Sequence, residues 1–376
     1  MKGEIKRGLE NFQPPPSPLL HKEGESVRRF QNRQDTKMKN KKGAKVLVTG
    51  ATGFLGSHLL EHLLAKGETN LRVLTTSAPD WLQERGVEII EGSITNRQIV
   101  QIAVEGVKQI YHLAGKVSRN EDDNRQMYSV HIDGTRLLCE EAKNSGVERI
   151  VLCSSSGTIA ITDDGFEIPD ETWPTPMEII AKFPYYASKL YQEKTARAIC
   201  GNDIDLVILN PSLLLGPGDD RLSSTNDVLH FLAGDIPAIP SGGINFVDVR
   251  DVAQTFHTAM ERGITGERYL LAGPNWTLER FFGHLERISK VDAPRVKIPN
   301  KLHKIASKTI ETVYDQLGKK PPVDPISMEM SRYFWYADAS KAKRDLNFDP
   351  RDPQETLYDT VHYIRKQFLG AGVFLS

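Results

Sequence analysis

The chain has 376 residues, of which 39% are hydrophobic and 26% are charged. Such a chain can bury a sizeable core, and its length predicts two domains, or one domain with an elaboration. Lys and Arg total 48 against 49 for Asp and Glu, so no overall field favours nucleic acid or an anionic membrane. Three scattered cysteines support neither a disulfide framework nor a zinc site, and we predict no metal centre.

Residues 1–43 differ from the rest of the chain, because a proline run is followed by basic and polar residues without a sustained period. Such a segment cannot bury enough apolar surface to offset its ordering entropy, so we predict a disordered N-terminal extension. A natural product that begins at Met38 would open directly into the first strand, which the mass of the endogenous protein can test. A basic targeting peptide is the competing hypothesis, disfavoured by the acidic residues and by the lack of an amphipathic face.

The chain contains no run of about 18 apolar residues, the length that a membrane span needs. The N-terminus also lacks the apolar core of a signal peptide. Together with the low cysteine count, these features predict a cytoplasmic protein.

From residue 45 onward, short apolar runs alternate with helical stretches. The runs are KVLV, LRVLTT, VEII, QIYHLA, RIVLCSS and DLVILN. Continuous apolar strands of this kind belong to a parallel sheet that is covered on both faces. The pattern therefore predicts the α/β class, with a Rossmann-type doubly wound parallel sheet. After Asn210 the regularity weakens, although INFVDV and ERYLLAG remain strand candidates, and the last hundred residues are predicted to be mostly helical with proline breaks at KKPPVDP and FDPRDP.

The segment VTGATGFLG places Gly50, Gly53 and Gly56 directly after the first strand and at the start of a helix. Glycines in this context allow a tight turn, close approach of the backbone to a pyrophosphate, and close packing of helix on strand. The helix N-terminus then directs its NH groups at the phosphates. The GxxGxxG spacing is one residue longer than the common fingerprint, and a glycine turn without a ligand is the alternative. We predict a dinucleotide site.

The segment KFPYYASKLYQEK, residues 182–194, contains three tyrosines and three lysines. Pro184 predicts the start of a helix, in which Tyr185 and Lys189 share a face at a spacing of four. Tyr186 is three residues from Lys189, so spacing alone does not exclude it. A phenol donates protons well near neutral pH if a nearby cation lowers its pKa from about 10. YxxxK is common by chance, and other segments must decide its role.

The TGATGFLG turn, the YxxxK pair and a serine cluster between them resemble the extended short-chain dehydrogenase/reductase family over about residues 45–365. Four further segments agree with the family: YHLAG, GTRLLCEEA, NPSLLLGPGD and FVDVRDVA. The last two are most similar to the dihydroflavonol 4-reductase branch and its bacterial relatives, including those labelled hopanoid-associated sugar epimerases. The resemblance implies an NAD(P)-binding Rossmann domain over 44–212 and 244–273, and a smaller, mostly helical substrate-binding region over 213–243 and 274–376.

The resemblance also implies roles for individual residues. Tyr185 matches the catalytic tyrosine, which would give a proton to the substrate oxygen as hydride arrives. Lys189 matches the catalytic lysine, which would bind the nicotinamide ribose and lower the phenol pKa. In VLCSSSGT, periodicity does not choose among three serines, but the family pattern selects Ser155. Ser154 and Ser156 would then satisfy backbone groups at the strand end.

The cofactor contacts that the resemblance implies extend along the predicted crevice. They are Gly50, Thr52, Gly53, Phe54, Leu55, Gly56, Thr76, Leu113, Ala114, Gly115, Tyr185, Lys189, Pro211 and Leu213. Two departures from the family pattern occur near these residues. Ser93 stands where the family has an aspartate that touches the adenine. His131 stands where the family has an asparagine, and we interpret it as a packed helix residue rather than a catalyst.

The choice between NAD and NADP is made at the end of the second strand. Here the strand ends with Thr75, Thr76 and Ser77, without an acid to repel a 2′-phosphate and without an arginine at the usual position. Hydroxyl groups can still bind a phosphate, with Arg72 or Arg85 as nearby cations. The sequence slightly favours NADP over NAD.

Three functions compete. The first is a reductase that moves hydride from NADPH to a ketone or aldehyde of a small, apolar or ring-shaped substrate. The second is a nucleotide-sugar epimerase or dehydratase that retains NAD; SGGIN lacks the arginine that often precedes FVDV, although Arg221, Arg250 or Arg332 could replace it. The third is a cofactor sensor without catalysis, which the Tyr and Lys pair disfavours. A homodimer is consistent with the resemblance, and the sequence does not name the substrate.

Overall fold

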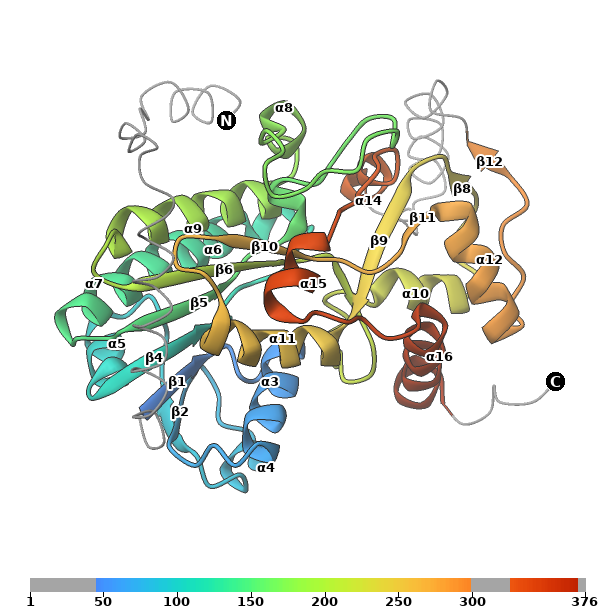
Figure 1. Ribbon diagram of the computed structural model, residues 1–376. Coiled ribbons are helices and arrows are strands. Elements are labelled where there is room, and N and C mark those ends of the chain that lie inside the picture. Colours follow the sequence, from blue (N-terminus) through green and yellow to red (C-terminus); the bar gives the residue numbers. More distant parts are fainter. Residues whose placement is uncertain (1–44, 299–324, 371–376) are drawn as a thin grey trace. The chain divides into compact units, whose positions relative to one another are not determined.

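The computed structural model describes residues 45–298 and 325–370, and a seven-stranded parallel sheet forms its centre (Figure 1). Its order is β10–β6–β5–β4–β1–β2–β3, and every neighbouring pair is parallel. The strands are β1 (Lys45–Thr49), β2 (Leu71–Thr75), β3 (Glu88–Glu91), β4 (Val107–His112), β5 (Arg149–Cys153), β6 (Asp205–Pro211) and β10 (Arg268–Leu271). The predicted doubly wound sheet is confirmed. The predictions for residues 1–43, including a start at Met38, lie outside the described residues.

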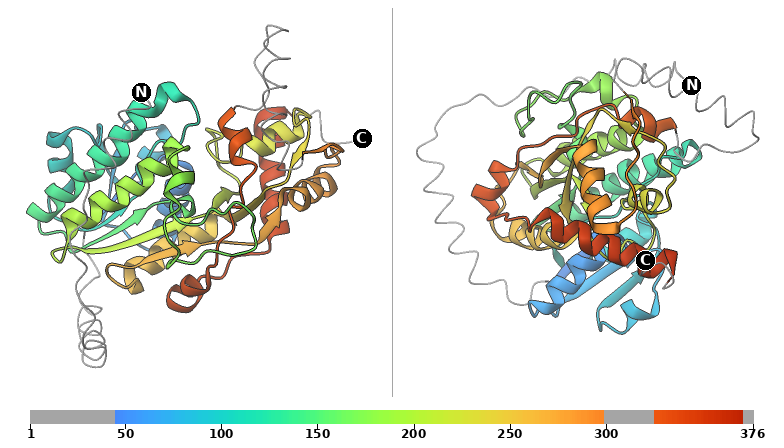
Figure 2. Two further views of the ribbon diagram at one scale, coloured as in Figure 1. Left: turned by 90° about the horizontal axis from the view of Figure 1, so that it is seen from above. Right: turned by 90° about the vertical axis from the view of Figure 1, so that its right-hand side faces the viewer.

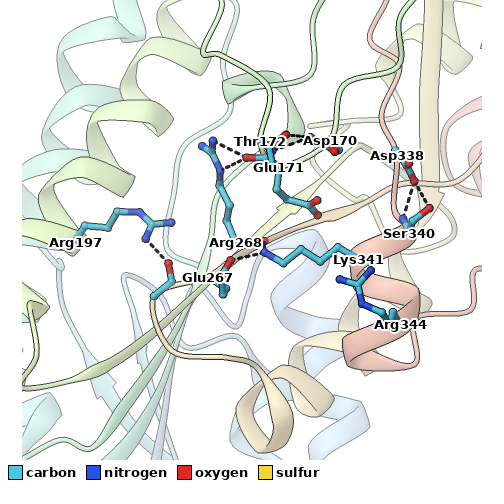
Figure 3. Close-up of a pocket in the computed structure, with 11 residues that line it drawn as sticks. Asp170, Glu171, Thr172, Arg197, Glu267, Arg268, Asp338, Ser340, Lys341 and Arg344 are labelled. Atoms are coloured by element: carbon cyan, nitrogen blue, oxygen red, sulfur yellow. Dashed lines mark hydrogen bonds and ion pairs between the residues drawn. The ribbon is translucent and has the colours of Figure 1, made fainter. Parts of the chain in front are cut away.

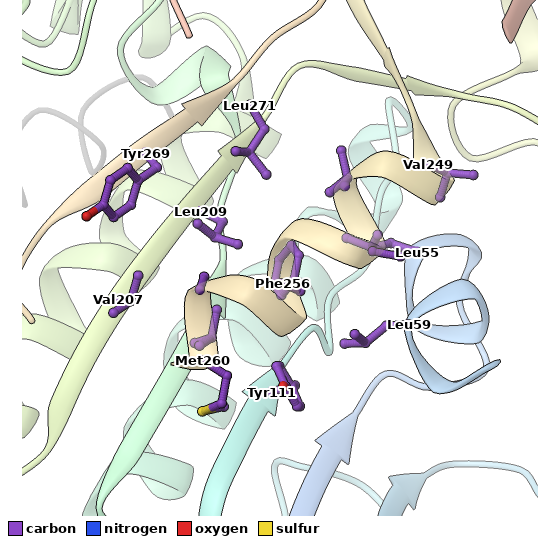
Figure 4. Close-up of a cluster of buried hydrophobic side chains, with 14 of the residues drawn as sticks. Leu55, Leu59, Tyr111, Val207, Leu209, Val249, Phe256, Met260, Tyr269 and Leu271 are labelled. Atoms are coloured by element: carbon purple, nitrogen blue, oxygen red, sulfur yellow. The ribbon is translucent and has the colours of Figure 1, made fainter. Parts of the chain in front are cut away.

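Helices cover both faces of this sheet, which explains why strands β1, β2, β5 and β6 are buried along almost their whole length. One face is covered by α3 (Phe54–Ala65), α11 (Val249–Arg262) and α15 (Ser340–Leu346), and the other by α5 (Arg97–Val104), α7 (Thr135–Asn144) and α9 (Pro184–Cys200). Figure 4 shows part of the first layer, where Phe256 of α11 lies among side chains from α3 and the strands. Phe256, Leu59 and Leu209 are fully buried there. Each strand therefore meets apolar side chains on both sides.

Shorter helical segments connect these elements. They are α4 (Asp80–Gln83), α6 (Asn124–Tyr128) and α8 (Met177–Ile180), the 3-10 turns Glu121–Asp123 and Ser156–Thr158, and the π-helices Ser129–Gly134 and Arg365–Leu369.

The strand order reverses between β1 and β4, and this reversal creates a crevice at their carboxyl ends. The segments that follow the two strands touch, since the Leu113 NH donates to the Thr49 carbonyl at 3.1 Å. Gly50 has φ 75°, and a Cβ atom there would lie 2.7 Å from the Ala114 nitrogen. The turn therefore requires glycine at this position, and it brings the two predicted cofactor segments together.

A smaller region lies beside the central sheet (Figure 2). It contains the three-stranded sheet of β7 (Leu213–Leu215), β9 (Gly243–Asp248) and β11 (Asn275–Thr277), and the pair β8 (Ile239–Pro240) and β12 (Lys297–Ile298). Its helices are α10 (Asn226–Leu232), α12 (Leu278–Ser289), α14 (Pro325–Met330) and α16 (Pro353–Ile364). Helices α10, α12 and α16 pack on an aromatic core that includes Phe231, Phe246 and Trp276, whereas α14 packs on a separate cluster with Phe183 and Tyr333. The predicted helical character is confirmed for the described residues, with a break between α15 and α16 at FDPRDP. The break predicted at KKPPVDP falls almost entirely outside those residues, and the predicted domain boundaries remain predictions.

A substitution at Gly56 tests the packing of the glycine turn. A Cβ atom at Gly56 would lie 2.0 Å from the Gly50 carbonyl oxygen and 2.8 Å from the Ala51 Cα. We expect Gly56→Ala to lower the free energy of unfolding by about 1–3 kcal/mol, because backbone atoms must shift to accept the methyl group. Urea denaturation measures this change.

The matched control for this prediction is Gly283→Ala in α12. A Cβ atom at Gly283 would meet no atom within 4 Å, so we expect this variant to gain about 0.5–1 kcal/mol from helix propensity. Equal denaturation midpoints for Gly56→Ala and the unchanged protein would contradict the packing argument.

Candidate active site

A cavity of about 1360 Å³ opens at the carboxyl ends of β1, β4, β5 and β6 and continues into the smaller region. Every residue that the sequence predicted for cofactor binding or catalysis lines it. Its volume exceeds the roughly 300–1,000 Å³ of a typical small-ligand pocket, so it has room for a dinucleotide and a second molecule. The fold therefore brings all the predicted residues to one site, while their individual roles remain proposals.

The N-terminus of α3 fits a pyrophosphate. Gly53 is its N-cap, no side chain caps the helix, and the first turn carries no acidic residue. A Cβ atom at Gly53 would approach only the Gly50 carbonyl oxygen, at 3.3 Å. The first-turn NH groups and the positive end of the helix dipole thus border the cavity without a competing carboxylate. These residues fit the dinucleotide that the sequence predicts.

The two candidate cations for a 2′-phosphate have different positions. Arg72 is buried, and its guanidinium donates to the carbonyls of Ile102, Ala103 and Glu105 at the end of α5. The suggestion that Arg72 could contact the phosphate is therefore wrong, because its donors stabilise a helix C-terminus instead. Arg85 lines the cavity, as do Thr76 and Ser77.

Helix α9 begins at Pro184, as predicted, and carries Tyr185 and Lys189 into the cavity. The Lys189 ammonium donates to the Cys153 carbonyl and to Gln192 Oε1, both at 2.9 Å. Burial lowers the pKa of Lys189. Because an ammonium has three N–H groups, these two bonds leave one N–H for a ligand.

The expected depression of the Tyr185 pKa is not found in this structure. Burial raises the pKa of Tyr185 well above the usual phenol value, with smaller contributions from Cys153 and Tyr186. Lys189 directs its ammonium at Cys153 and Gln192 rather than at the phenol. The loss of water around the phenol outweighs the nearby cation.

The structure distinguishes the three serines at the end of β5. The Ser154 hydroxyl donates to the buried carboxylate of Glu193. The Ser155 hydroxyl accepts from the Gly157 NH at 3.3 Å and lines the cavity. Ser156 begins a 3-10 turn and also lines the cavity. Ser154 is thus occupied by a structural bond, whereas Ser155 has a hydroxyl hydrogen for a ligand.

Glu193 is a residue that the sequence analysis missed. Its carboxylate lies 3.0 Å from the Thr158 hydroxyl and accepts from Asn210 Nδ2 at 2.7 Å. Asn210 also donates to the Ser155 carbonyl at 3.0 Å. The signal was present, because Glu193 follows Lys189 by four residues and so faces the same way on α9. Glu193 holds the turn that carries the candidate serine.

The substrate end of the cavity is largely aromatic and aliphatic. Tyr186 and Trp335 lie with ring centroids 4.8 Å apart, and Ile244, Leu278 and Met330 line the same space. Phe231, Trp276 and Phe281 are core residues rather than part of this lining. Aromatic and aliphatic side chains at this end favour an apolar ligand.

Charged groups at this end are engaged with one another. Arg119 makes a two-pronged ion pair with Asp227 at 2.9 and 3.0 Å, and also donates to Ser327. Lys116 binds Asp123 at 2.6 Å. Among the three arginines proposed to receive a diphosphate, Arg221 lines the cavity.

The other two proposed arginines are held elsewhere. Arg250 binds Asp248 and Asp359, and Arg332 binds Glu329. Neither Arg250 nor Arg332 lines the cavity. A diphosphate would therefore find fewer available cations here than the sequence allowed.

A second cavity, of about 710 Å³, lies at the edge strand β10 and contains none of the predicted site residues (Figure 3). Its cations have partners, since Arg268 donates to the Glu171 carbonyl and Lys341 binds Glu267. It is therefore a weaker candidate for an active site. In the part of the chain that the structure describes, no group of three or more His, Cys, Asp or Glu residues is placed to hold a metal ion. Likewise, none of the described helices is long and apolar enough to cross a membrane.

Comparison with known proteins agrees with this site. Residues 46–272 match the model of the NAD dependent epimerase/dehydratase family. The chain is 33% identical over 324 residues to the Synechocystis sp. protein named "Putative dihydroflavonol 4-reductase", covering 85% of this chain and 94% of that protein. It is 32% identical over 331 residues to Sterol demethylase protein B of Methylococcus capsulatus, covering 85% and 98% of the two chains.

Among solved structures, gox2253 superposes with a TM-score of 0.76 at 29% identity, covering 87% of this chain and 100% of that one. DesIV, a dTDP-glucose 4,6-dehydratase from Streptomyces venezuelae solved with NAD and TYD, superposes with a TM-score of 0.68 at 21% identity, covering 88% and 99%. The second likeness shows the fold alone. With its fold, its glycine turn and these matches, the chain belongs to the NAD-dependent epimerase/dehydratase family, within the extended short-chain dehydrogenases/reductases, and is an NAD(P)-dependent enzyme.

Proposed function

We propose that the protein is an NADPH-dependent reductase that converts a ketone or aldehyde on an apolar, ring-bearing small molecule into an alcohol. The observation that carries this proposal is the substrate end of the cavity, where Tyr186 and Trp335 line the wall and the cations Arg119 and Lys116 are held in ion pairs. A nucleotide sugar would have to displace Asp227 or Asp123 from Arg119 or Lys116. The reductase names of relatives in the dihydroflavonol 4-reductase group also support it.

Bound NADPH would supply the hydride, held by the α3 N-terminus and the residues along the crevice. Lys189 would direct its third N–H at the nicotinamide ribose, because its other two are engaged. The Ser155 hydroxyl would donate to the substrate carbonyl oxygen and hold it near Tyr185. Tyr185 would then transfer its phenol proton to that oxygen as negative charge develops on it.

The raised pKa of Tyr185 suits the reductive direction. Because the folded-state pKa lies above the ordinary value, the phenol keeps its proton throughout the neutral range and can act as an acid. Oxidation of an alcohol needs the phenolate, which burial disfavours. The side chain is therefore present in the protonated form that reduction requires.

A nucleotide-sugar epimerase or dehydratase is the second candidate, and one observation favours it. Arg221 is exposed and lines the cavity, where it could contact a diphosphate. Such an enzyme would retain NAD through an internal oxidation and reduction, which gives the test below a clear alternative outcome.

The first test identifies the nucleotide. We expect that protein purified without added nucleotide releases no nucleotide when it is denatured. We also expect the native protein to bind NADPH reversibly and more tightly than NADH. Fluorescence titration measures both dissociation constants. Tightly retained NAD, or affinity for NADH about tenfold better than for NADPH, would overturn the cofactor assignment.

Arg85 provides the matched variants for this test. Arg85→Ala should weaken the binding of NADPH about tenfold and leave the binding of NADH unchanged, because only NADPH carries the 2′-phosphate. Glu61 lines the cavity and binds Arg85 at 2.7 Å, so Glu61→Gln should keep or improve NADPH affinity.

The proton donor is tested by Tyr185→Phe. We expect kcat for carbonyl reduction to fall by about 10²–10⁴-fold, because the substrate oxygen loses its acid, while NADPH affinity is unchanged. Tyr191→Phe on the same helix, a residue that does not line the cavity, should retain full activity.

The pH dependence gives the same test a second readout. In the unchanged enzyme, alcohol oxidation should rise with pH into the alkaline range, whereas reduction should show no loss from phenol ionisation up to about pH 9. Reduction that declines between pH 7 and 8 through ionisation of Tyr185 would contradict the raised pKa.

The serines are separated by two alanine variants. Ser155→Ala should lower kcat with little change in stability, because its hydroxyl faces the cavity. Ser154→Ala should instead lower the free energy of unfolding by about 1–3 kcal/mol, because Glu193 loses a donor while buried. Steady-state kinetics and urea denaturation of both variants check the assignment, and the reverse pattern would assign the substrate contact to Ser154.

A further inference from the structure

His131 occupies the position between the cofactor crevice and Tyr185. It is fully buried and lies on the π-helix Ser129–Gly134, directly before α7. A π-helical turn inside a helix often marks a functional site. Its ring meets the Tyr185 ring edge to face, with centroids 5.9 Å apart and an interplanar angle of 70°. The histidine is thus more than a packed helix residue, because it touches the proposed proton donor.

Hydrogen bonds define where the His131 ring carries its proton. The Lys116 backbone NH donates to Nε2 at 3.1 Å, so Nε2 is an acceptor without a hydrogen. The Ser188 hydroxyl donates its hydrogen to the Tyr185 carbonyl at 2.7 Å. Nδ1, which lies 2.8 Å from the Ser188 oxygen, must therefore be the donor in that contact. The ring is neutral with its proton on Nδ1.

The surroundings favour this neutral form. Burial lowers the pKa of His131 well below its ordinary value, and the charge of Lys189 adds to the effect. A Cβ atom on Gly115 would lie 2.9 Å from His131 Nε2 and 3.5 Å from Lys189 Nζ. The ring therefore fills the space that glycine leaves open at the end of the β4 segment.

The two bonds connect two walls of the site. Lys116 belongs to the segment after β4 that begins with the cofactor-lining residues Leu113, Ala114 and Gly115. Ser188 lies on the first turns of α9, where it also holds the Tyr185 carbonyl. A displacement of either wall stretches a bond to the same small ring.

We propose that His131 is a positioning residue that sets the placement of Tyr185 relative to the nicotinamide wall, through one bond to Ser188 and one to the Lys116 NH. The inference rests on the proposed function to the extent that Tyr185 is the proton donor. In this role, His131 affects the alignment of the proton transfer and leaves cofactor binding at the glycine turn intact.

Substitutions can remove the two bonds separately. In His131→Asn the amide can replace Nδ1 as the donor to Ser188, and in His131→Gln it can replace Nε2 as the acceptor for Lys116. His131→Phe keeps an aromatic ring and removes both bonds. We expect kcat to fall about 100-fold in His131→Phe and less in the other two, with KM and the NADPH dissociation constant unchanged within about threefold, since small misplacements near the reacting atoms cost up to about 10²-fold.

Double variants test the bond to Ser188. Ser188→Ala and His131→Gln both break this link, and Ser188→Ala also removes the bond to the Tyr185 carbonyl, so combining them should cost no more than Ser188→Ala alone. Ser188→Ala combined with His131→Asn should approach the His131→Phe value, because both links are then lost. If the decrease in ln kcat for Ser188→Ala with His131→Gln equals the sum of the two single decreases, the proposed link is overturned.

Leu138→Ala is the control for general destabilisation, because Leu138 is fully buried on α7 and does not line the cavity. It should lower the melting temperature without selective loss of kcat. A similar kcat loss in Leu138→Ala would assign the effect of the His131 variants to instability.

A readout without substrate separates this inference from the proposed function. Nitrogen-15 NMR of histidine-labelled protein without nucleotide should show His131 neutral at pH 7 with its proton on Nδ1. A charged ring, or a proton on Nε2, would overturn the inference whatever the substrate. Turnover of nucleotide sugars alone would refute the reductase proposal, and the kcat comparison would then be made with those sugars.

Discussion

The buried carboxylate of Glu193 organises the catalytic side of the cavity. A charge in the protein interior is tolerated only where hydrogen bonds replace its lost hydration. Here Ser154, Thr158 and Asn210 surround one carboxylate oxygen, and the Arg268 guanidinium lies 3.9 Å from the other. These contacts connect α9 with the ends of β5, β6 and β10. The turn that carries Ser155 is thereby held against the same helix that carries Tyr185.

Helix α9 divides its contacts between two stripes of side chains. Tyr185, Lys189 and Glu193 follow one another at a spacing of four, and all three contact or border the strand ends. Ser188 and Gln192 form a neighbouring stripe toward the His131 and α7 side, where Gln192 donates to the Thr135 hydroxyl at 2.9 Å. A single rigid element therefore sets the relative positions of the proposed donor, its lysine and their supports.

Local patterns made much of this structure predictable. The apolar strands, the glycine turn and the start of α9 at Pro184 were all confirmed, because each depends on neighbours within a few residues. The environment of Arg72 depends on carbonyls about thirty residues away, and no periodicity reports such a contact. The Tyr185 pKa was mispredicted for a related reason: spacing located the cation, whereas burial, which depends on the whole fold, determined the shift.

The role of Arg72 has a consequence for how the enzyme family can change. Its three bonds to the end of α5 and its ion pair with Glu88 tie the second strand to a neighbouring helix and strand. Replacing Arg72 would disturb folding before it altered nucleotide choice. Arg85 and Glu61 instead pair through exposed side chains at the rim, so changes there are tolerated more easily. Under the proposed role of Arg85, cofactor preference can therefore change at the rim while the sheet beneath stays the same.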